Sequence, residues 1–482
     1  MNRSIRMRRV VGGTIGGRRH LHDVQRRRRK WYRRLHGQVE LPRAQQTFAD
    51  VQWRSQPAPS LRIVILEDAV TPQLELAGPK KIRSMRKDMR RMLHLASERS
   101  QMRPYALISA RRRSARFPPI GRRPDGPRPE TRALYLPAMG IAIVPELSAQ
   151  EAHALESAGA VVLANELVTI DDPASSGSAV RVPSSAHLDA IDINAARSAG
   201  LTGSGVRIGV LDTGIDPSHP EFADTSIEFM AFKTNGERRA IKPKDFDSHG
   251  THVAALCAGK TVGVAPGAEL VIAAVMTERN LQGKICGYLA QILAGMDWLA
   301  GSGGAGKGVD VVNASLGSPG SASGYFASVE AYRQSGILTI AAIGNSGKLG
   351  IGRHSAPGML DCALGVGAID NSGRVADFSD WGLCHAVPAS SDYKPDMMAP
   401  GVDVTSAVPG KSYASKSGTS MACPIVTGSA ALLIERDASL RGDPDALTRK
   451  LLDLAVPLPR QSAGYDDRRG GRGRLMLTTI AN

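Results

Sequence analysis

Ser420 lies where a small polar turn runs into an apolar segment, and this setting suits a nucleophile. The turn is Ser417-Gly418-Thr419-Ser420, and the segment 425–434 that follows, IVTGSAALLI, is long enough for a buried helix. A serine at such a junction either caps the helix with its hydroxyl or acts as a nucleophile at the positive end of the helix dipole. The second role requires a base, an orienting carboxylate and an oxyanion donor elsewhere, because a serine hydroxyl alone is a weak nucleophile.

Three other residues could supply those groups. Asp212 closes an apolar stretch, although a lone carboxylate there could simply cap a turn. His249 lies three residues before His252, and the pair lacks a third metal ligand at the spacing of a zinc protease. Asn345 follows another apolar stretch, where asparagine is also a common turn former. Each signal is weak alone, but the order Asp, His, Asn, Ser is distinctive and indicates nucleophilic catalysis by a serine.

The body of the chain, residues 185–482, alternates apolar strands with helical patterns. This alternation predicts an α/β fold in which a mostly parallel sheet is covered by helices on both faces. Ligands of such sheets bind beyond the carboxyl ends of the strands. Asp212, Asn345 and the segment Ser315-Leu316-Gly317 all follow predicted strands, so we expect them to meet at one edge. The predicted strands are residues 206–211, 270–275, 309–313, 337–343 and 362–366, and the predicted helices are 249–258, 288–299, 326–334 and the segment after Ser420.

Residues 61–171 predict a separate, small α+β domain of the split βαβ (ferredoxin-like) kind. Its apolar periodicity switches between strand and helix patterns, and an Arg- and Pro-rich insertion interrupts it at 99–130. The expected strands are 61–66, 140–144 and 160–163, and the expected helices are 80–97 and one opened by the capping box Ser148…Glu151.

Two further segments flank this small domain. Residues 1–60 are Arg-rich with little apolar periodicity, so we expect a disordered tail. Residues 172–184 are small, polar and proline-containing, which predicts an exposed linker of the kind that proteases cut.

The positive charge of the chain is concentrated at its front. The 482 residues carry a net charge of +16. Residues 1–130 contain 32 Lys and Arg against 10 Asp and Glu, a net of +22, whereas the remainder contains 29 against 35, a net of −6. The basic run 26–34 includes Trp31 and Tyr32 and could bind nucleic acid by phosphate contacts and stacking. A solvated tail explains it more simply, and we expect no nucleic-acid partner.

Several classes of protein are excluded or disfavoured by composition. No run of about 18 uncharged apolar residues occurs, so no membrane span is predicted. The basic start is not followed by an apolar stretch of signal-peptide length. The five cysteines are odd in number, widely spaced and confined to the body, so they are expected to be buried small hydrophobes. At most two disulfides could form, and no paired C-x-x-C zinc spacing is present.

Residues from about 185 to 482 resemble the subtilisin-like serine proteases (subtilases). The matching stretches are VRIGVLDTGID, DSHGTHVAAL, VGVAPGAEL, VVNASLGS, IAAIGNSG, KPDMMAPG and SGTSMACPIVTGSAALL, and they cover nearly the whole body. The resemblance implies a three-layer subtilisin-like fold and hydrolysis of peptide bonds in protein or peptide substrates. It also implies secretion, whereas the missing apolar signal stretch leaves the compartment unassigned.

The resemblance further implies a role for each motif residue. Ser420 would be the nucleophile, His249 the general base and then acid, and Asp212 the carboxylate that fixes the imidazole tautomer. The Asn345 amide and the Ser420 N–H would form the oxyanion hole.

Two short segments would line the primary specificity pocket and hold an extended peptide through their backbones. They are Ser315, Leu316, Gly317 and Ala342, Ile343, Gly344. Glycine walls without an acidic residue imply an apolar or broad preference, although the glycines could also serve only sheet packing.

Residues 61–171 resemble the inhibitory propeptide of the family, most clearly in 133–163. The chain would then be a zymogen with its own propeptide as intramolecular inhibitor, and we expect a monomer. Glu221 matches a calcium ligand of some relatives, but the path from Gly259 to Val264 is shorter than their calcium-binding loop. We therefore expect no metal site and no cofactor, since calcium needs about six to eight oxygen ligands.

Two other functions remain open at this point. A peptide-binding pseudoprotease would use the same groove without chemistry, and a nucleic-acid-associated protein would act through its Arg-rich tail. The presence of all four catalytic residue types favours a serine endopeptidase made as a self-inhibited zymogen.

Overall fold

A computed structural model of the chain describes the body almost throughout and the front in part. The described residues are 61–65, 134–136, 138–145, 147, 149–150, 152–153, 160–170, 184–301, 308–318, 322–384, 392–461 and 465–480. The predicted tail 1–60, the helix 80–97, the insertion 99–130 and nearly all of the linker 172–184 lie outside these residues.

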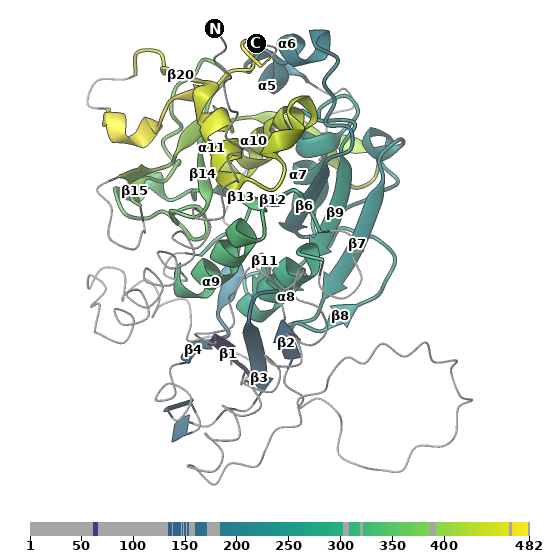
Figure 1. Ribbon diagram of the computed structural model, residues 1–482, viewed down its shortest axis with the longest axis vertical. Helices are drawn as coiled ribbons and strands as arrows, with labels where there is room; N and C mark the ends of the chain where they lie inside the picture. The colour runs from purple at the N-terminus through teal and green to yellow at the C-terminus, as the bar shows by residue number, and fades with distance from the viewer. Residues whose placement is uncertain are drawn as a thin grey trace, which may run out of the picture.

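A ten-stranded sheet forms the centre of the body (Figure 1), in the order β20-β21-β17-β14-β13-β12-β6-β9-β7-β8. Pairing is parallel from β21 through to β7, and only the two outermost pairs are antiparallel. The predicted mainly parallel sheet is therefore confirmed. The strands are β6 Arg207–Asp212, β7 Ile227–Phe232, β8 Arg238–Arg239, β9 Glu269–Ala274, β12 Val311–Ala314, β13 Leu338–Ala342, β14 Leu364–Ile369, β17 Met397–Pro400, β20 Ala455–Val456 and β21 Arg474–Leu475.

Helices cover both faces of this sheet because its central strands are apolar on both sides. Alternate residues of β9 divide between two cores: Leu270 and Ile272 pack with α7 and α10, whereas Val271 packs with α8 and α9. The first layer holds α7 His249–Ala258, α10 Thr419–Arg436, α11 Pro444–Asp453 and the short α5 Ala186–Asp189 and α6 Ile193–Ser198. The second layer holds α8 Leu289–Leu299 and α9 Ala322–Gln334. Short 3-10 turns are η1 Pro220–Phe222, η2 Gly347–Leu349, η3 Ala438–Leu440 and η4 Asp467–Gly470.

A small four-stranded antiparallel sheet lies below α8 and α9 in Figure 1, in the order β2-β3-β1-β4. Its inward residues Ile63, Ile141 and Ile143 belong to the same apolar cluster as α8. The strands are β1 Leu61–Ile65, β2 Leu134–Leu136, β3 Ile141–Pro145 and β4 Val161–Ala164. Three of them match predicted strands, whereas β2 was not predicted. The split βαβ arrangement stays a prediction, since most of the expected helical residues are not described.

The front segment also contributes a strand to the body. β5 Leu167–Thr169 pairs antiparallel with β11 Ile285–Tyr288, which pairs in turn with β10 Glu278–Arg279. An isolated antiparallel bridge then joins Thr169 to Gly317. β5 is therefore flanked by two segments of the body.

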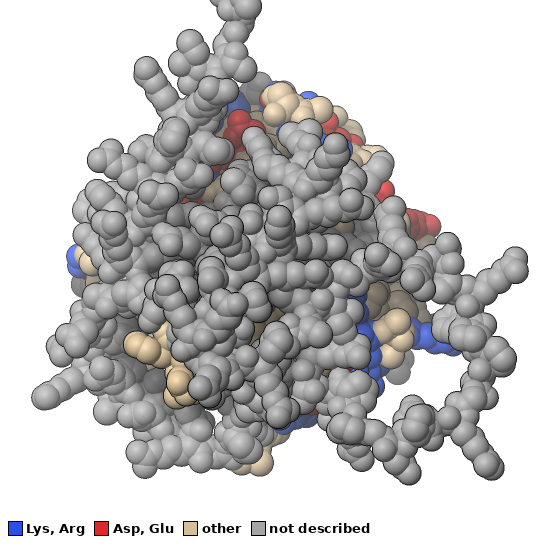
Figure 2. All heavy atoms as spheres, turned by 60° about the horizontal axis from the view of Figure 1, so that its bottom comes forward, with Lys and Arg blue, Asp and Glu red and all other residues tan. Residues whose placement is uncertain are grey.

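Two hairpins complete the described elements: β15 Gly382–Leu383 with β16 Tyr393–Lys394, and β18 Val404–Val408 with β19 Ser412–Lys416. Among the described helices, none is long and apolar enough to cross a membrane. Figure 2 brings the side of the small sheet forward, and the described side chains visible at its edges carry both positive and negative charge.

Candidate active site

Asp212 and His249 meet in the body, although 37 positions separate them in the chain. β6 ends at Asp212 and α7 begins at His249, so a strand end and a helix start hold the two side chains. The His249 Nδ1 atom lies 2.8 Å from Oδ1 and 2.9 Å from Oδ2 of Asp212. A carboxylate is acceptor-only, so the ring proton is assigned to Nδ1 and the Nε2 lone pair is left as the basic site.

Burial dominates the electrostatics of this pair, because Asp212 is 0% and His249 2% exposed. Burial raises the pKa of Asp212, while the His249 imidazole and the Thr213 N–H, 2.7 Å from Oδ1, oppose that effect by stabilising the charged form. An imidazolium at His249 would therefore be stabilised by a carboxylate that has no access to water.

The start of α7 is anchored by Asp245, which the sequence analysis missed. Its Oδ1 accepts from the Thr213 hydroxyl at 2.6 Å, and its Oδ2 accepts from the Thr251 N–H at 2.7 Å and hydroxyl at 2.6 Å. The Thr213 hydroxyl oxygen also accepts from the Gly250 N–H at 2.8 Å. Asp245 thus ties the turn after β6 to the first turn of α7. The sequence signal that could have identified Asp245 is the presence of an acidic residue four positions before His249.

His252 has a structural task that differs from that of His249. Its Nε2 lies 3.1 Å from the Val404 carbonyl and 3.0 Å from the Ala414 carbonyl, which belong to the two strands of the β18–β19 hairpin. Burial holds the pKa of His252 well below its ordinary value. No group of three or more His, Cys, Asp or Glu side chains that could hold a metal ion occurs within the described residues.

Ser420 is the second residue of α10 and is 4% exposed. α10 packs closely on α7, since a Cβ added at Gly428 would lie 3.1 Å from the Cys257 carbonyl oxygen. Ser420 and Ser315 contact each other twice: the Ser315 Oγ donates to the Ser420 carbonyl at 2.9 Å, and the Ser420 Oγ lies 3.4 Å from the Ser315 carbonyl oxygen. The predicted nucleophile is therefore next to a predicted substrate-binding residue.

Asn345 lies beside the residue that precedes Ser420. Its Oδ1 accepts from the Thr419 N–H at 2.8 Å and from the Thr419 hydroxyl at 3.0 Å. The Thr419 hydroxyl oxygen accepts in turn from the Gly344 N–H at 3.2 Å. Because Thr419 uses the acceptor half of the amide, the donor half, Nδ2, points away from Thr419.

The two predicted substrate-binding segments lie on either side of Ser355, which the sequence analysis did not identify. A Cβ at Gly317 would lie 2.9 Å from the Ser355 Cβ, and one at Gly344 would lie 3.1 Å from the Ser355 Oγ. A Cβ at Gly344 would also collide with the Asp380 carboxylate. These contacts support the alternative that the glycines serve packing.

Asp380 is a buried acid behind the Gly344 turn, 1% exposed. Its backbone N–H donates to the Gly344 carbonyl at 3.0 Å. The Ser346 N–H approaches its carboxylate, but no group of the described residues makes a full hydrogen bond to either oxygen. Burial raises the pKa of Asp380 to about 7, although Arg353 and Arg469 act in the opposite direction.

Glu221 does not offer the coordination that calcium requires. Its carboxylate accepts from the Thr261 N–H at 2.7 Å, the Val262 N–H at 3.2 Å, the Tyr413 hydroxyl at 2.8 Å and the Thr261 hydroxyl. The short path from Gly259 to Val264 thus supplies hydrogen-bond donors where a cation would need oxygen ligands. The residues present do not fit a calcium ion at this position.

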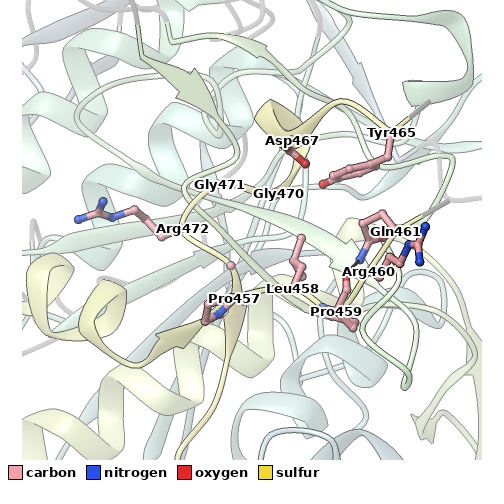
Figure 3. Close-up of a pocket in the computed structure, with 11 residues that line it drawn as sticks. Pro457, Leu458, Pro459, Arg460, Gln461, Tyr465, Asp467, Gly470, Gly471 and Arg472 are labelled. Atoms are coloured by element: carbon pink, nitrogen blue, oxygen red, sulfur yellow. Dashed lines mark hydrogen bonds between the residues drawn. The ribbon is translucent and has the colours of Figure 1, made fainter. Parts of the chain in front are cut away.

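A hollow of about 580 Å³ lies near the C-terminus (Figure 3), and none of the predicted site residues lines it. In the close-up the Arg472 side chain extends away from Arg460, so these two cations do not converge on a common ligand position. All five cysteines carry free thiols, and only Cys384 is partly exposed.

The chain is similar in sequence to known proteins of one family. The sequence profile of the Subtilase family matches residues 203–471. Subtilisin BL from Lederbergia lenta is 39% identical over 250 residues, which cover 51% of this chain and 82% of the relative. An alkaline protease from Alkalihalobacillus alcalophilus is 36% identical over 299 residues, which cover 61% and 69%. Among solved structures, a cold adapted subtilisin-like serine proteinase matches with a TM-score of 0.45 and 29% identity, covering 57% of this chain and 88% of that one.

Proposed function

The chain belongs to the subtilase family and is a serine endopeptidase of that type, and we propose that Asp212, His249 and Ser420 are its catalytic triad. The observation that carries the assignment is the buried His249–Asp212 pair, held at the end of β6 and the start of α7. α7 packs against α10, and Ser420 lies in the first turn of α10.

In the proposed mechanism the Ser420 Oγ attacks the carbonyl carbon of the scissile bond while the His249 Nε2 takes its proton. Asp212 keeps the imidazole in the Nδ1–H tautomer and stabilises the imidazolium. The Asn345 Nδ2 and the Ser420 N–H donate to the oxyanion. His249 then returns the proton to the leaving amine, and water hydrolyses the acyl-enzyme through the same steps in reverse.

A fluorophosphonate probe tests the triad, because it labels an activated serine. We expect labelling of the full chain to disappear in Ser420→Ala and His249→Ala. Ser429→Ala is the matched control, since its hydroxyl is buried in the same helix and donates to the Ile425 carbonyl at 2.9 Å. Strong labelling that survives in His249→Ala would show that another group is the base.

We propose further that residues 61–171 act as an inhibitory propeptide, so that the enzyme is made as a zymogen. The pairing of β5 with β11 and the Thr169–Gly317 bridge support this, because an extended peptide substrate would bind by the same backbone pairing. Val168, at the centre of β5, is 0% exposed.

The register of β5 also favours one cleavage position. Thr169 is opposite Gly317 in an antiparallel bridge, and Gly317 lies two positions after Ser315, whose carbonyl contacts Ser420. An extended substrate bound in this register would have the residue two positions after its own counterpart of Thr169 opposite Ser315. We therefore propose the bond between residues 171 and 172 as the first one cut. Holding that bond beside the nucleophile would make cleavage intramolecular and fast.

N-terminal sequencing of the matured protein tests this proposal. The expected new terminus is Asp172, and Ser420→Ala should stay full-length in a protease-deficient host. Processing of Ser420→Ala at the same bond would show that another protease performs the cut.

A further inference from the structure

Helix α10 lacks one hydrogen-bond donor close to the proposed nucleophile. In an α-helix the N–H of residue i+4 donates to the carbonyl of residue i. The residue four positions after Ser420 is Pro424, which lies inside α10 and has no N–H. The Ser420 carbonyl therefore cannot receive its usual helical hydrogen bond, and Ser420 is buried.

The hydroxyl of Ser315 supplies the missing donor. Its Oγ lies 2.9 Å from the Ser420 carbonyl oxygen, and Ser315 is fully buried just beyond β12. A buried carbonyl without a partner is costly, so this contact stabilises the start of α10. It also fixes the main chain of Ser420 to the central sheet.

Two further buried side chains orient the Ser315 hydroxyl. The Asn313 Nδ2 donates to the Ser315 Oγ at 3.0 Å and fills one of the two acceptor positions of that oxygen. The Thr427 hydroxyl lies 3.1 Å from the Asn313 Oδ1 and 3.0 Å from the Cys423 carbonyl oxygen, so its single proton is shared between these two acceptors. Hydrogen bonds thus run from the Asn313 amide through the Ser315 hydroxyl to the Ser420 carbonyl, with Thr427 beside the amide oxygen.

We propose that Ser315 is a positioning residue whose hydroxyl replaces the N–H that Pro424 lacks and so holds the Ser420 backbone for catalysis. The proposal rests on the proposed function, in which the Ser420 Oγ attacks and its N–H stabilises the oxyanion. It gives the Ser315 side chain a task distinct from peptide binding, which the backbone of the same residue would perform. Removing the hydroxyl should therefore lower kcat and leave KM nearly unchanged.

Ser315→Ala and Pro424→Ala together test the proposal by a double-mutant cycle in the matured enzyme. Ser315→Ala alone should lower kcat about tenfold, the scale of one buried hydrogen bond, with KM within about twofold of the wild type. Pro424→Ala restores the N–H that can donate to the Ser420 carbonyl. In that background the same Ser315→Ala change should lower kcat by less than about twofold, because the lost donor has been replaced.

Equal losses in the two backgrounds would overturn the proposal, as would a rise in KM with kcat unchanged. Fluorophosphonate titration of active sites and a thermal melt establish that each variant is folded. If Ser315→Ala fails to fold, Thr427→Val provides the second test, with an expected loss of about threefold in kcat alone. Ser429→Ala should match the wild type. Hydrolysis that survives in Ser420→Ala would instead refute the proposed function, so the two failures are distinguishable.

Discussion

The front segment, residues 61–170, and the ten-stranded sheet relate to the proposed active site in different ways. In the body, the proposed triad lies at the end of β6 and at the starts of α7 and α10, and side-chain hydrogen bonds from Asp245, Asn345 and Ser315 hold the backbone of these helix starts. Among the described residues of the front segment, β5 pairs with the body beside the proposed site, and it does so through its backbone. Beside β5, the Leu289 N–H donates to the Glu166 carbonyl at 2.9 Å, and the Ala290 N–H donates to the Asn165 Oδ1 at 2.8 Å.

This difference shows which contacts beside the proposed active site a bound substrate could replace. Backbone pairing along β11 is available to any extended peptide, so a substrate could replace β5 there. The side-chain contacts around Asp212, His249 and Ser420 depend on particular residues and have no substitute. Changes in the body should therefore affect chemistry or stability, and changes in β5 should affect the docking of the front segment and the proposed inhibition.

The largest effect is expected for Asn345→Ala, which tests the oxyanion donor proposed for the body. Loss of such a donor in subtilisin, a member of the same family, costs about 10²–10³ in kcat. A similar loss in kcat with little change in KM is expected here, measured on a peptide substrate after active-site titration. If Asn345→Ala kept wild-type kcat, the oxyanion donor would have to be another group.

The Asp380→Asn variant should reveal how the buried Asp380 carboxyl makes the stability of the body depend on pH. The folded-state pKa of about 7 lies above the ordinary 3.8, so the folded protein holds this proton more tightly than the unfolded chain. The contribution of this proton to wild-type stability is therefore present at about pH 4 and is lost as the pH rises to about 7. The asparagine side chain of the variant does not titrate, so its contribution has no such dependence.

The free energy of unfolding of the variant should match that of the wild type near pH 4 and exceed it by about 2–4 kcal/mol at pH 8. Denaturant titrations at several pH values measure this difference. A difference that does not vary with pH would mean that the carboxylate is not held in its uncharged form.

Val168→Asp tests the front segment in a chain that cannot cut itself. In a Ser420→Ala background, burial of Val168 contributes about 1.5–3 kcal/mol to docking, so its loss should weaken docking about 10–100-fold. Cys286 provides the readout, because it pairs with Thr169 and is buried. Burial also raises the pKa of its thiol to about 11.

Maleimide should therefore label Cys286 faster in Val168→Asp by about the same factor. Cys286→Ser identifies the signal that comes from this thiol. Equal labelling rates with and without the Val168 change would show that β5 does not protect the groove.

The smallest effect is expected for calcium removal. The Glu221 carboxylate already has four donors, so EGTA should shift the melting temperature by less than about 2 °C. Tyr413→Phe is the positive comparison, because loss of its hydrogen bond to Glu221 should cost about 1–2 kcal/mol. A large destabilisation by EGTA that calcium reverses would reveal a site elsewhere in the chain.

The sequence predicted the five central strands of the main sheet, β14, β13, β12, β6 and β9, because each has a recognisable apolar pattern within a few residues. The strands on either side of them, β7 and β17 among them, were not predicted. A strand that ends at Asp212 and a helix that begins at His249 are recognisable within a few residues, and the structure brings both together. Ser355, Asp380 and the side-chain task of Ser315 were not predicted, since each depends on partners far away in the chain. The Ser315–Ser420 contact, for example, joins residues 105 positions apart.

The front segment was harder to predict for a related reason. β2 has only three residues, too few to show an alternation. The register of β5 is determined by β11, more than 100 residues later in the chain, and not by its own sequence. Apolar periodicity identifies a strand but does not identify its partner.

The two histidines at the start of α7 should give different magnetic resonance signals. His249 carries its proton on Nδ1, as its contact with Asp212 requires, whereas His252 must carry it on Nε2 to donate to the Val404 and Ala414 carbonyls. ¹⁵N chemical shifts distinguish these tautomers. His252 should give a constant signal across neutral pH because burial keeps its ring uncharged. A spectroscopist could therefore follow protonation of His249, the proposed catalytic base, with an internal reference in the same helix.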